Sequence, residues 1–152
     1  MRLVVQRVEK AKVICVSDKK VKDGIVVGEI GEGLLVLLGV KKGDTEKDAE
    51  ALAVKLSKLR VMADAEDRMN LSVGDVKGSV LVVSQFTLHA DTGGGNRPSF
   101  INAEDPKRAK ELYEFFVEKL KKSGIKIETG SFGDYMKIEA VLDGPVTIIY
   151  SD

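Results

Sequence analysis

Apolar and polar positions in the first part of the chain follow the patterns of strands rather than helices. Residues 3–8 and 11–16 are rich in β-branched side chains, and residues 25–30 resume that pattern after a polar hairpin tip at residues 19–24. Residues 34–40 are apolar without interruption, which indicates a central strand that is covered on both faces. We therefore expect the first forty residues to form much of a sheet.

The spacing of apolar residues then changes to that of a helix. Asp44 or Thr45 can cap this helix, and its apolar face is formed by Ala49, Leu52, Ala53, Leu56 and Leu59. Residues 60–63 have the composition of a short strand. Residues 64–78 are polar and rich in turn formers, and we expect no regular element there.

A second strand-then-helix unit follows. The pattern of residues 79–88 strongly predicts a strand, and residues 90–98 are expected to form a glycine-rich loop. Asp105 is placed to cap the second helix, Pro106 suits its first turn because the missing N–H is harmless there, and Gly124 suits its end. The apolar face of this helix comprises Ala109, Leu112, Tyr113, Phe116, Val117 and Leu120.

The order of elements predicts the fold class. Residues 125–129, 136–142 and 146–150 close the chain as strands, and no linker, low-complexity tract or repeat divides it. We therefore predict one α/β domain over residues 1–152, with layered β-sheet and two main helices. Two helices cannot cover every face of so many strands, so a second sheet layer or a subunit partner is expected to cover the rest.

Composition and charge narrow the class of protein. Hydrophobic residues make up 43% and charged residues 32%, as in globular chains. Lys plus Arg and Asp plus Glu both number 24, so contact with RNA would need a local basic patch. No apolar run is long enough to span a membrane, and residues 1–7 lack the apolar stretch of a signal peptide. We expect a cytoplasmic protein with no membrane partner.

The single cysteine and the single histidine limit metal chemistry. Cys15 lies in an apolar run and is expected to be a buried core residue, since the chain offers it no disulfide partner. With His89 as the only histidine, a site with several histidine ligands cannot be built. We therefore expect no metal and no cofactor.

Two segments carry candidate chemistry. Ser84, Gln85, Phe86 and Thr87 end an apolar strand, and α/β proteins often bind ligands where the strands end. They offer hydroxyls, an amide and a stacking surface, although an ordinary half-buried strand with polar residues facing water has the same pattern.

The second segment, residues 143–147, interrupts a strand-like stretch with Gly144 and Pro145. Proline belongs at an edge, a start or a bulge of a strand, and a Gly–Pro bond can be cis at modest cost. A tight turn between the last two strands is the alternative interpretation.

Together the two segments resemble the signature motifs of the D-aminoacyl-tRNA deacylases, and the resemblance runs nearly end to end. Further matching segments are residues 5–8, 28–30, 33–40, 69–72, 90–92, 97–100, 129–130 and 132–133. The chain departs from the family at Leu142, where asparagine is frequent. It also departs at the hairpin of residues 19–24, which is longer than usual, and at residues 93–96, which are less basic.

The resemblance implies a homodimeric hydrolase that cleaves the ester of D-aminoacyl-tRNA, and of glycyl-tRNA mischarged on tRNA(Ala), with active sites at the interface. In the family the Gly–Pro bond is cis and its loop enters the active site of the other subunit. Gly144 and Pro145 are thus expected to reject L-amino acids, and Arg7 to help lock that loop across the interface. Phe132 and Met136 match positions that line the pocket.

For catalysis the resemblance places Ser84, Gln85 and Thr87 around the scissile ester and Phe86 with them as a substrate-binding residue. Thr87 is the natural candidate for a protein nucleophile, but a threonine hydroxyl is a weak nucleophile without an adjacent base. His89 is a poor candidate for that base. The resemblance favours assistance by the terminal 2′-hydroxyl of the tRNA, with the protein positioning it and donating to the oxyanion.

Two non-catalytic interpretations stay open at this point: an RNA-binding module and a structural domain. Contact with tRNA is expected through a small basic surface, although the lysines that end the second helix also suit an ordinary solvated helix end. The candidates for that surface are Arg7, Lys10, Arg97, Lys119, Lys121 and Lys122.

Overall fold

The computed structural model describes residues 1–16 and 24–151, so nearly all of the hairpin tip expected at residues 19–24 lies outside the described residues. Within them the predicted α/β architecture with two main helices is confirmed. The strands are β1 (Arg2–Cys15), β2 (Ile25–Ile30), β3 (Gly33–Gly39), β4 (Arg60–Ala63), β5 (Met69–Ser72), β6 (Ser79–Ser84), β7 (Lys126–Thr129) and β8 (Met136–Ser151). The helices are α1 (Glu46–Ser57), α2 (Pro106–Lys121) and the short 3-10 helix η1 (Phe86–His89).

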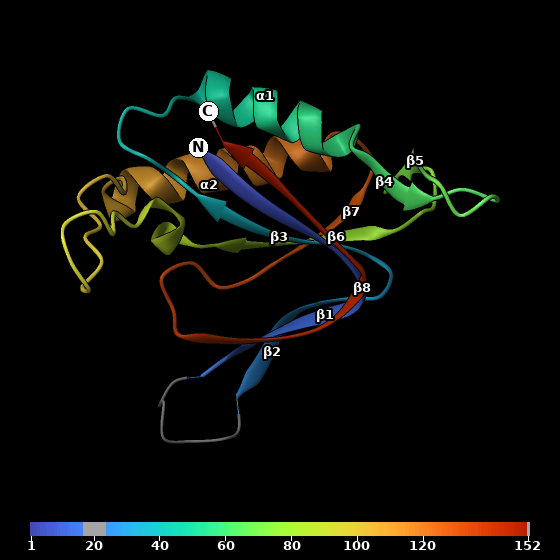
Figure 1. Ribbon diagram of the computed structural model, residues 1–152, viewed down its shortest axis with the longest axis horizontal. Coiled ribbons are helices and arrows are strands. Elements are labelled where there is room, and N and C mark those ends of the chain that lie inside the picture. The colour runs from blue at the N-terminus through green and yellow to red at the C-terminus, as the bar shows by residue number, and fades with distance from the viewer. Residues whose placement is uncertain (17–23, 152) are drawn as a thin grey trace.

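The two α-helices lie side by side over one face of the sheet, and β1 and β8 continue past them into a curled part that includes β2 (Figure 1). The order in the sheet is β2-β1-β3-β6-β7, with β8 paired to β1, while β4 and β5 form a separate hairpin. Strands β3, β6 and β7 run parallel, and β1 is antiparallel to each of its partners. Among the described residues, no helix is both long and apolar enough to cross a membrane.

Strand β3 is buried on both faces, as its uninterrupted apolar run predicts. Leu34, Val36 and Leu38 pack in the main core beneath the helices, where they join Phe116 of α2. Leu35 faces a second core inside the curled part of the sheet. That second core comprises Val8, Ala11, Val13, Ile30, Leu35, Leu81 and Val83. The curvature of the sheet therefore supplies much of the second layer that two helices could not provide.

Strand β1 is a single strand where the pattern predicted two, at residues 3–8 and 11–16. Glu9 has no partner on β8, although its neighbours on both sides do. This extra residue shifts the alternation by one, so Val8 and Ala11 both face the second core. The gap between the two predicted strands is thus a bulge within one strand.

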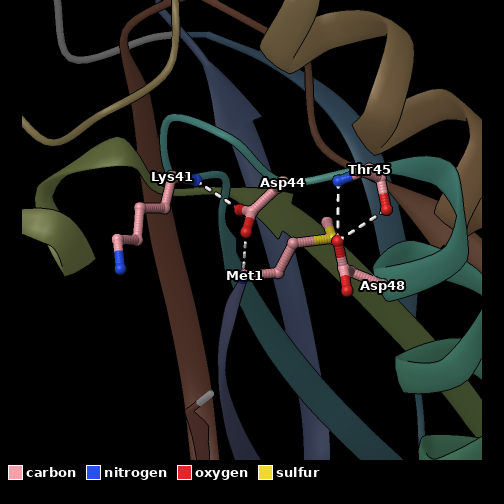
Figure 2. Close-up of polar contacts among 5 residues, drawn as sticks. All are labelled: Met1, Lys41, Asp44, Thr45 and Asp48. Carbon is pink, nitrogen blue, oxygen red and sulfur yellow. Dashed lines mark hydrogen bonds and ion pairs between the residues drawn. The ribbon is translucent and has the colours of Figure 1, made fainter.

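Helix α1 begins at the predicted cap. Thr45 is the N-cap, and the Asp48 carboxylate accepts hydrogen bonds from the Thr45 backbone N–H and hydroxyl, each at 2.7 Å (Figure 2). These bonds, the hydroxyl's first, lower the pKa of Asp48. Asp44, the other candidate cap, instead accepts from the amino group of Met1 at 2.6 Å and from the backbone N–H of Lys41 at 2.5 Å. It thereby joins the start of β1 to the loop before α1.

Helix α2 also follows its predicted pattern. The Asp105 carboxylate accepts from the backbone N–H of Lys107 at 3.0 Å, and Pro106 takes the first position. Gly124 lies beyond the end of the helix with φ of 81°, a conformation that glycine adopts readily. The buried face consists of Leu112, Tyr113, Phe116, Val117 and Leu120. Both helix predictions are confirmed.

Three further features differ from the sequence prediction, and one of them is that β8 is a single strand where two were expected, at residues 136–142 and 146–150. Residues 64–78 contain β5, which pairs with β4 in a short hairpin, although its composition is that of turns. The strand expected over residues 79–88 ends at Ser84, and η1 follows it. The early end of β6 decides the shape of the site, because it turns the polar motif out of the sheet.

Candidate functional site

The polar segment after β6 lies at the edge of a cavity of about 820 Å³. Ser84 is the last residue of β6, and the backbone N–H of Gln85 donates to the carbonyl oxygen of Leu38 on β3 at 2.8 Å. The chain then forms η1, so Phe86 and Thr87 are exposed, whereas the strand before them is buried. Polar groups thus begin to face the cavity where the parallel strands end, as in many α/β proteins.

The cavity brings together every predicted residue of the first motif and both predicted pocket residues. These are Ser84, Gln85, Phe86, Thr87, Phe132 and Met136. The side-chain amide of Gln85 donates a hydrogen bond to the hydroxyl oxygen of Thr87. An amide cannot accept the proton of the threonine, so this contact positions the hydroxyl without activating it as a nucleophile.

Aromatic rings form part of the cavity wall. Phe86 and Phe100 meet edge to face with centroids 5.0 Å apart, and Phe132 packs against Tyr113 at 5.7 Å. Phe86 is 56% exposed and Phe100 is 38% exposed. Their rings leave apolar surface at the cavity for an aromatic or aliphatic group of a ligand.

The charged residues that line the cavity are both acidic. Glu104 and Asp134 contribute carboxylates, and no lysine, arginine or histidine of the described chain is part of the lining. Such a lining favours a neutral or cationic group over a phosphate. The cavity is therefore suited to the amino-acid end of a nucleic-acid substrate rather than to its backbone.

Cys15 is not the buried core residue that its apolar neighbours predicted. It is only partly buried, and its thiol lies 3.7 Å from the Asp134 carboxylate, which also accepts from the Ser131 hydroxyl. Partial burial and then the negative charge of Asp134 raise the pKa of Cys15. A raised pKa disfavours the thiolate, which is the nucleophilic form of cysteine.

His89 lies outside the cavity. It borders a separate hollow of about 190 Å³ with Met1, Arg2 and Lys41, and the part of the chain that the structure describes gives its Nε2 no hydrogen-bond partner. Burial, first among the causes, lowers the pKa of His89. A buried histidine in another hollow is not placed to act as the base for Thr87.

The second motif lies on β8, away from the cavity lining. β8 runs unbroken from Met136 to Ser151, so the tight turn considered for residues 143–147 is wrong. Residues 143–146 all lie opposite Arg7 alone, because the residues on either side of Arg7 keep regular partners. A bulge of this kind is where a sheet accommodates glycine and proline. The Gly144–Pro145 bond is cis, as expected, and both residues are exposed.

Arg7 contacts this bulge within its own chain. Its Nε lies 2.8 Å from a carboxylate oxygen of Asp143, and its Nη1 donates to the backbone carbonyl of Val61 on β4 at 2.8 Å. The structure therefore divides the predicted site residues into two groups. One group lines the cavity, and the other, Arg7 with Gly144 and Pro145, surrounds the bulge on β8.

Comparison with known proteins identifies the family. The sequence model of a family described as D-Tyr-tRNA(Tyr) deacylase matches residues 4–151. The chain belongs to this family. Curated members include a D-aminoacyl-tRNA deacylase of Aquifex aeolicus, 55% identical over 149 residues that cover 98% of this chain and 96% of the relative. Another, from Thermotoga petrophila, is 54% identical and covers 98% of this chain and 95% of the relative.

Two solved structures share the fold of this deacylase-family chain. A protein described as c-Myc DNA unwinding element binding protein superposes with a TM-score of 0.89 at 37% identity, covering 100% of this chain and 99% of that one. A probable eukaryotic D-amino acid tRNA deacylase superposes with a TM-score of 0.78 at 14% identity, covering 98% and 97%, which supports the fold alone.

The sequence did not predict part of the cavity lining. The residues that it did not assign include Val40, Phe100, Ala103, Glu104, Tyr135 and Ile138. Phe100 lay in a segment that matched the family, but nothing in its local pattern places it beside Phe86. The loop before α2 and the loop before β8 reach the cavity from distant parts of the chain, and a single sequence carries no signal for that contact.

Proposed function

We propose that this deacylase-family protein hydrolyses the ester bond of D-aminoacyl-tRNA and releases the free D-amino acid and the tRNA. The observation that carries the proposal is the cavity of about 820 Å³ bordered by Ser84, Gln85, Phe86 and Thr87. The chain that builds it is 55% identical to a D-aminoacyl-tRNA deacylase over almost its whole length. The cytoplasm, where aminoacyl-tRNA is used, is the proposed place of action.

In the proposed reaction the protein positions the ester rather than attacking it. The hydroxyl of Thr87 accepts from the neutral amide of Gln85, and His89 lies in another hollow. An aminoacyl ester is already labile, so the terminal 2′-hydroxyl of the tRNA can assist hydrolysis when it is held near the ester carbonyl. Polar donors of the first motif would stabilise the developing oxyanion.

Chirality is proposed to be read by Gly144 and Pro145 of a second copy of the chain. Both residues are exposed on β8, and Gly144 follows the cavity residue Ile138 by six positions, on the order of 20 Å along an extended strand. The bulge therefore cannot close its own cavity without a large rearrangement. A partner subunit can bring its bulge to that cavity, where rigid backbone atoms leave no room for an L side chain.

The surface of β8 fits such an assembly. Ile138 and Leu142 are 37% and 44% exposed on one face of the strand that carries the bulge, and Val141, on its other face, is 40% exposed. Apolar residues of this kind are typical of interfaces between subunits. We propose a homodimer with active sites at its interface.

Glycine is the second proposed substrate. A filter that excludes L side chains by steric contact cannot reject an amino acid that has no side chain. Glycyl-tRNA mischarged on tRNA(Ala) is therefore expected to be hydrolysed, whereas L-alanyl-tRNA is expected to be spared.

Non-catalytic binding of nucleic acid is the rival function, and one solved relative is named for DNA binding. The acidic and apolar lining of this cavity does not favour it. Modules that bind single strands combine stacking rings with a basic groove, and only the rings are part of this lining.

Release of free amino acid by the purified protein tests the proposal. We expect D-tyrosyl-tRNA to be deacylated on the order of 100-fold faster than L-tyrosyl-tRNA, after correction for hydrolysis in buffer. Ala103→Phe, which fills the cavity from the loop before α2, is the control and should abolish release. Equal rates for the two enantiomers, or binding of tRNA without release, would contradict the proposed function.

A further inference from the structure

The guanidinium of Arg7 lies between two parts of the chain, Val61 on β4 and the bulge on β8. Nη1 donates to the carbonyl oxygen of Val61 at 2.8 Å, and Nε lies 2.8 Å from an oxygen of Asp143. Nη2 lies 3.2 Å from the position that a Cβ on Gly144 would take. The side chain of Arg7 is only 13% exposed, so the group is largely enclosed by these neighbours.

The contact between Arg7 and Asp143 is an ion pair rather than a directed hydrogen bond. The distance between Nε and the carboxylate is short, yet the N–H makes no hydrogen bond of good geometry. Asp143 therefore acts on Arg7 chiefly through its charge, and water screens part of that charge because the Asp143 side chain is 45% exposed. Removal of the charge would leave the guanidinium with Val61 as its remaining anchor.

The bulge needs such an anchor because the sheet does not hold it. Residues 143–146 lie opposite the single residue Arg7, so the regular ladder of β1 and β8 is interrupted there. Asp143 opens the bulge and directly precedes Gly144. The ion pair thus ties the first residue of the bulge to the side chain that borders Gly144.

We propose that Asp143 is a positioning residue for chiral selection: its carboxylate orients the Arg7 guanidinium, and Arg7 fixes the backbone at Gly144. This inference rests on the proposed function, in which Gly144 and Pro145 exclude the L side chain. Selection by steric contact requires the excluding atoms to be held within about 0.5 Å of their place. Asp143 supplies that constraint without touching the substrate.

The chain offers a matched control for this ion pair. Lys12 and Glu139 form another ion pair between β1 and β8, at 3.0 Å, with side chains 37% and 61% exposed. This pair lies in the regular part of the ladder, where Lys12 is opposite Glu139. Its removal changes charge and surface contacts on the same two strands but leaves the bulge alone.

The test compares D-tyrosyl-tRNA and L-tyrosyl-tRNA as substrates of Asp143→Ala, Asp143→Asn, Asp143→Glu and Glu139→Ala. We expect Asp143→Ala and Asp143→Asn to lower the ratio of kcat/KM for D over L by about tenfold, with KM for the D substrate nearly unchanged. Asp143→Glu should restore the ratio to within about threefold of the parent, since it keeps the charge. Glu139→Ala should leave the ratio unaltered.

Thermal unfolding of each variant and a parallel assay of Gly144→Ala separate the possible failures. If Asp143→Ala lowers Tm while the D over L ratio stays at the parent value, the positioning role is wrong and the ion pair is merely structural. If Gly144→Ala then loses activity toward the D substrate, the proposed function survives that failure. If Gly144→Ala retains both activity and selectivity, the filter itself is wrong, and the role of Asp143 is overturned with it.

Discussion

At Thr87 the hydroxyl that could attack an ester is instead held by a neutral neighbour, the amide of Gln85. Gly144, by contrast, is limited by space, because the methyl group of an alanine at this position would not fit. A Cβ there would lie 2.9 Å from the side chain and 3.0 Å from the backbone nitrogen of Val146, and φ of 117° disfavours any L side chain. If Thr87 only positions the ester and Gly144 excludes the L side chain, substitution by alanine should be mild at Thr87 and severe at Gly144.

We predict that Thr87→Ala retains kcat/KM toward D-tyrosyl-tRNA within about tenfold of the parent, whereas Gly144→Ala loses on the order of 100-fold or more. Loss of a true nucleophile costs many orders of magnitude, while loss of a positioning hydroxyl is mild. Deacylation kinetics of both variants, with folding verified by circular dichroism, measure the difference. A folded Thr87→Ala protein that binds tRNA but releases no amino acid would overturn the mechanism.

Protonation of His89, which lies outside the cavity, is disfavoured in the folded protein. Its pKa is lowered in the folded protein, mainly by burial, so the unfolded chain binds a proton more readily than the folded one. The stabilising effect of the neutral ring is therefore present above the unfolded pKa of about 6.5 and is lost as pH falls below it toward the folded value.

We predict that Tm of the parent falls between pH 7 and pH 5 by more than that of His89→Gln, which has no imidazole to protonate. The same variant should keep its deacylase activity at pH 7, because His89 lies outside the cavity. Parallel pH dependences of Tm in the two proteins would show that His89 is not the titrating group.

At the scale of elements, helices were predictable and the long strands were not. α1 and α2 follow from local features, namely the caps at Thr45 and Asp105 and a one-sided apolar face. β1 and β8 contain bulges at Glu9 and at residues 143–146, and a bulge breaks the two-residue period from which a strand is inferred. Each long strand was consequently read as two shorter ones.

The candidate site also has parts that the local sequence predicts and parts that it does not. Ser84 to Thr87 and the Gly144–Pro145 pair were found because each forms a short contiguous motif. Phe100 and Glu104 reach the cavity only through the path of the loop before α2. Gly144 and Pro145 lie outside the lining of the cavity that Ser84 to Thr87 border, which depends on the tertiary placement of β8 and not on any local pattern.

The C-terminal end of α2 is the element with a testable role in tRNA binding. Lys119 pairs with Glu50 at 2.6 Å and lies 5.1 Å from the ring centroid of Phe115, so it is engaged within the protein. Lys121 and Lys122 are exposed at the end of a helix whose first residue, Pro106, lines the cavity. A helix of 16 residues spans roughly 24 Å, a distance that an acceptor stem can bridge.

We predict that Lys121→Gln and Lys122→Gln together flatten the slope of log K against log salt for tRNA, by about 0.7 to 0.9 for each phosphate that is no longer neutralised. Lys119→Gln should leave the slope unaltered and serves as the control. Binding titrations between 50 and 200 mM salt suffice, since roughly this range resolves such slopes. An unchanged slope in the double variant would show that the end of α2 does not contact tRNA and would leave the loop around Arg97 as the better candidate.

At the scale of the whole molecule, the proposed active site requires two copies of the chain. The cavity at the end of β6 and the bulge on β8 each carry part of the proposed site, and the sheet keeps them apart within one chain. The net charge is zero, so repulsion between copies does not oppose association. Sedimentation of the active protein should accordingly show a dimer and not a monomer.

Complementation between two inactive variants tests this division of the site most directly. Ala103→Phe fills the cavity, and Gly144→Ala distorts the filter, so each homodimer should be inactive. A heterodimer purified through two different tags would contain one site with an intact cavity and an intact filter, and one site with neither. We predict that it recovers about half of the parent activity toward D-tyrosyl-tRNA. A heterodimer as inactive as the two variant homodimers, formed in good yield, would show that cavity and filter act within the same chain and would contradict an active site shared between subunits.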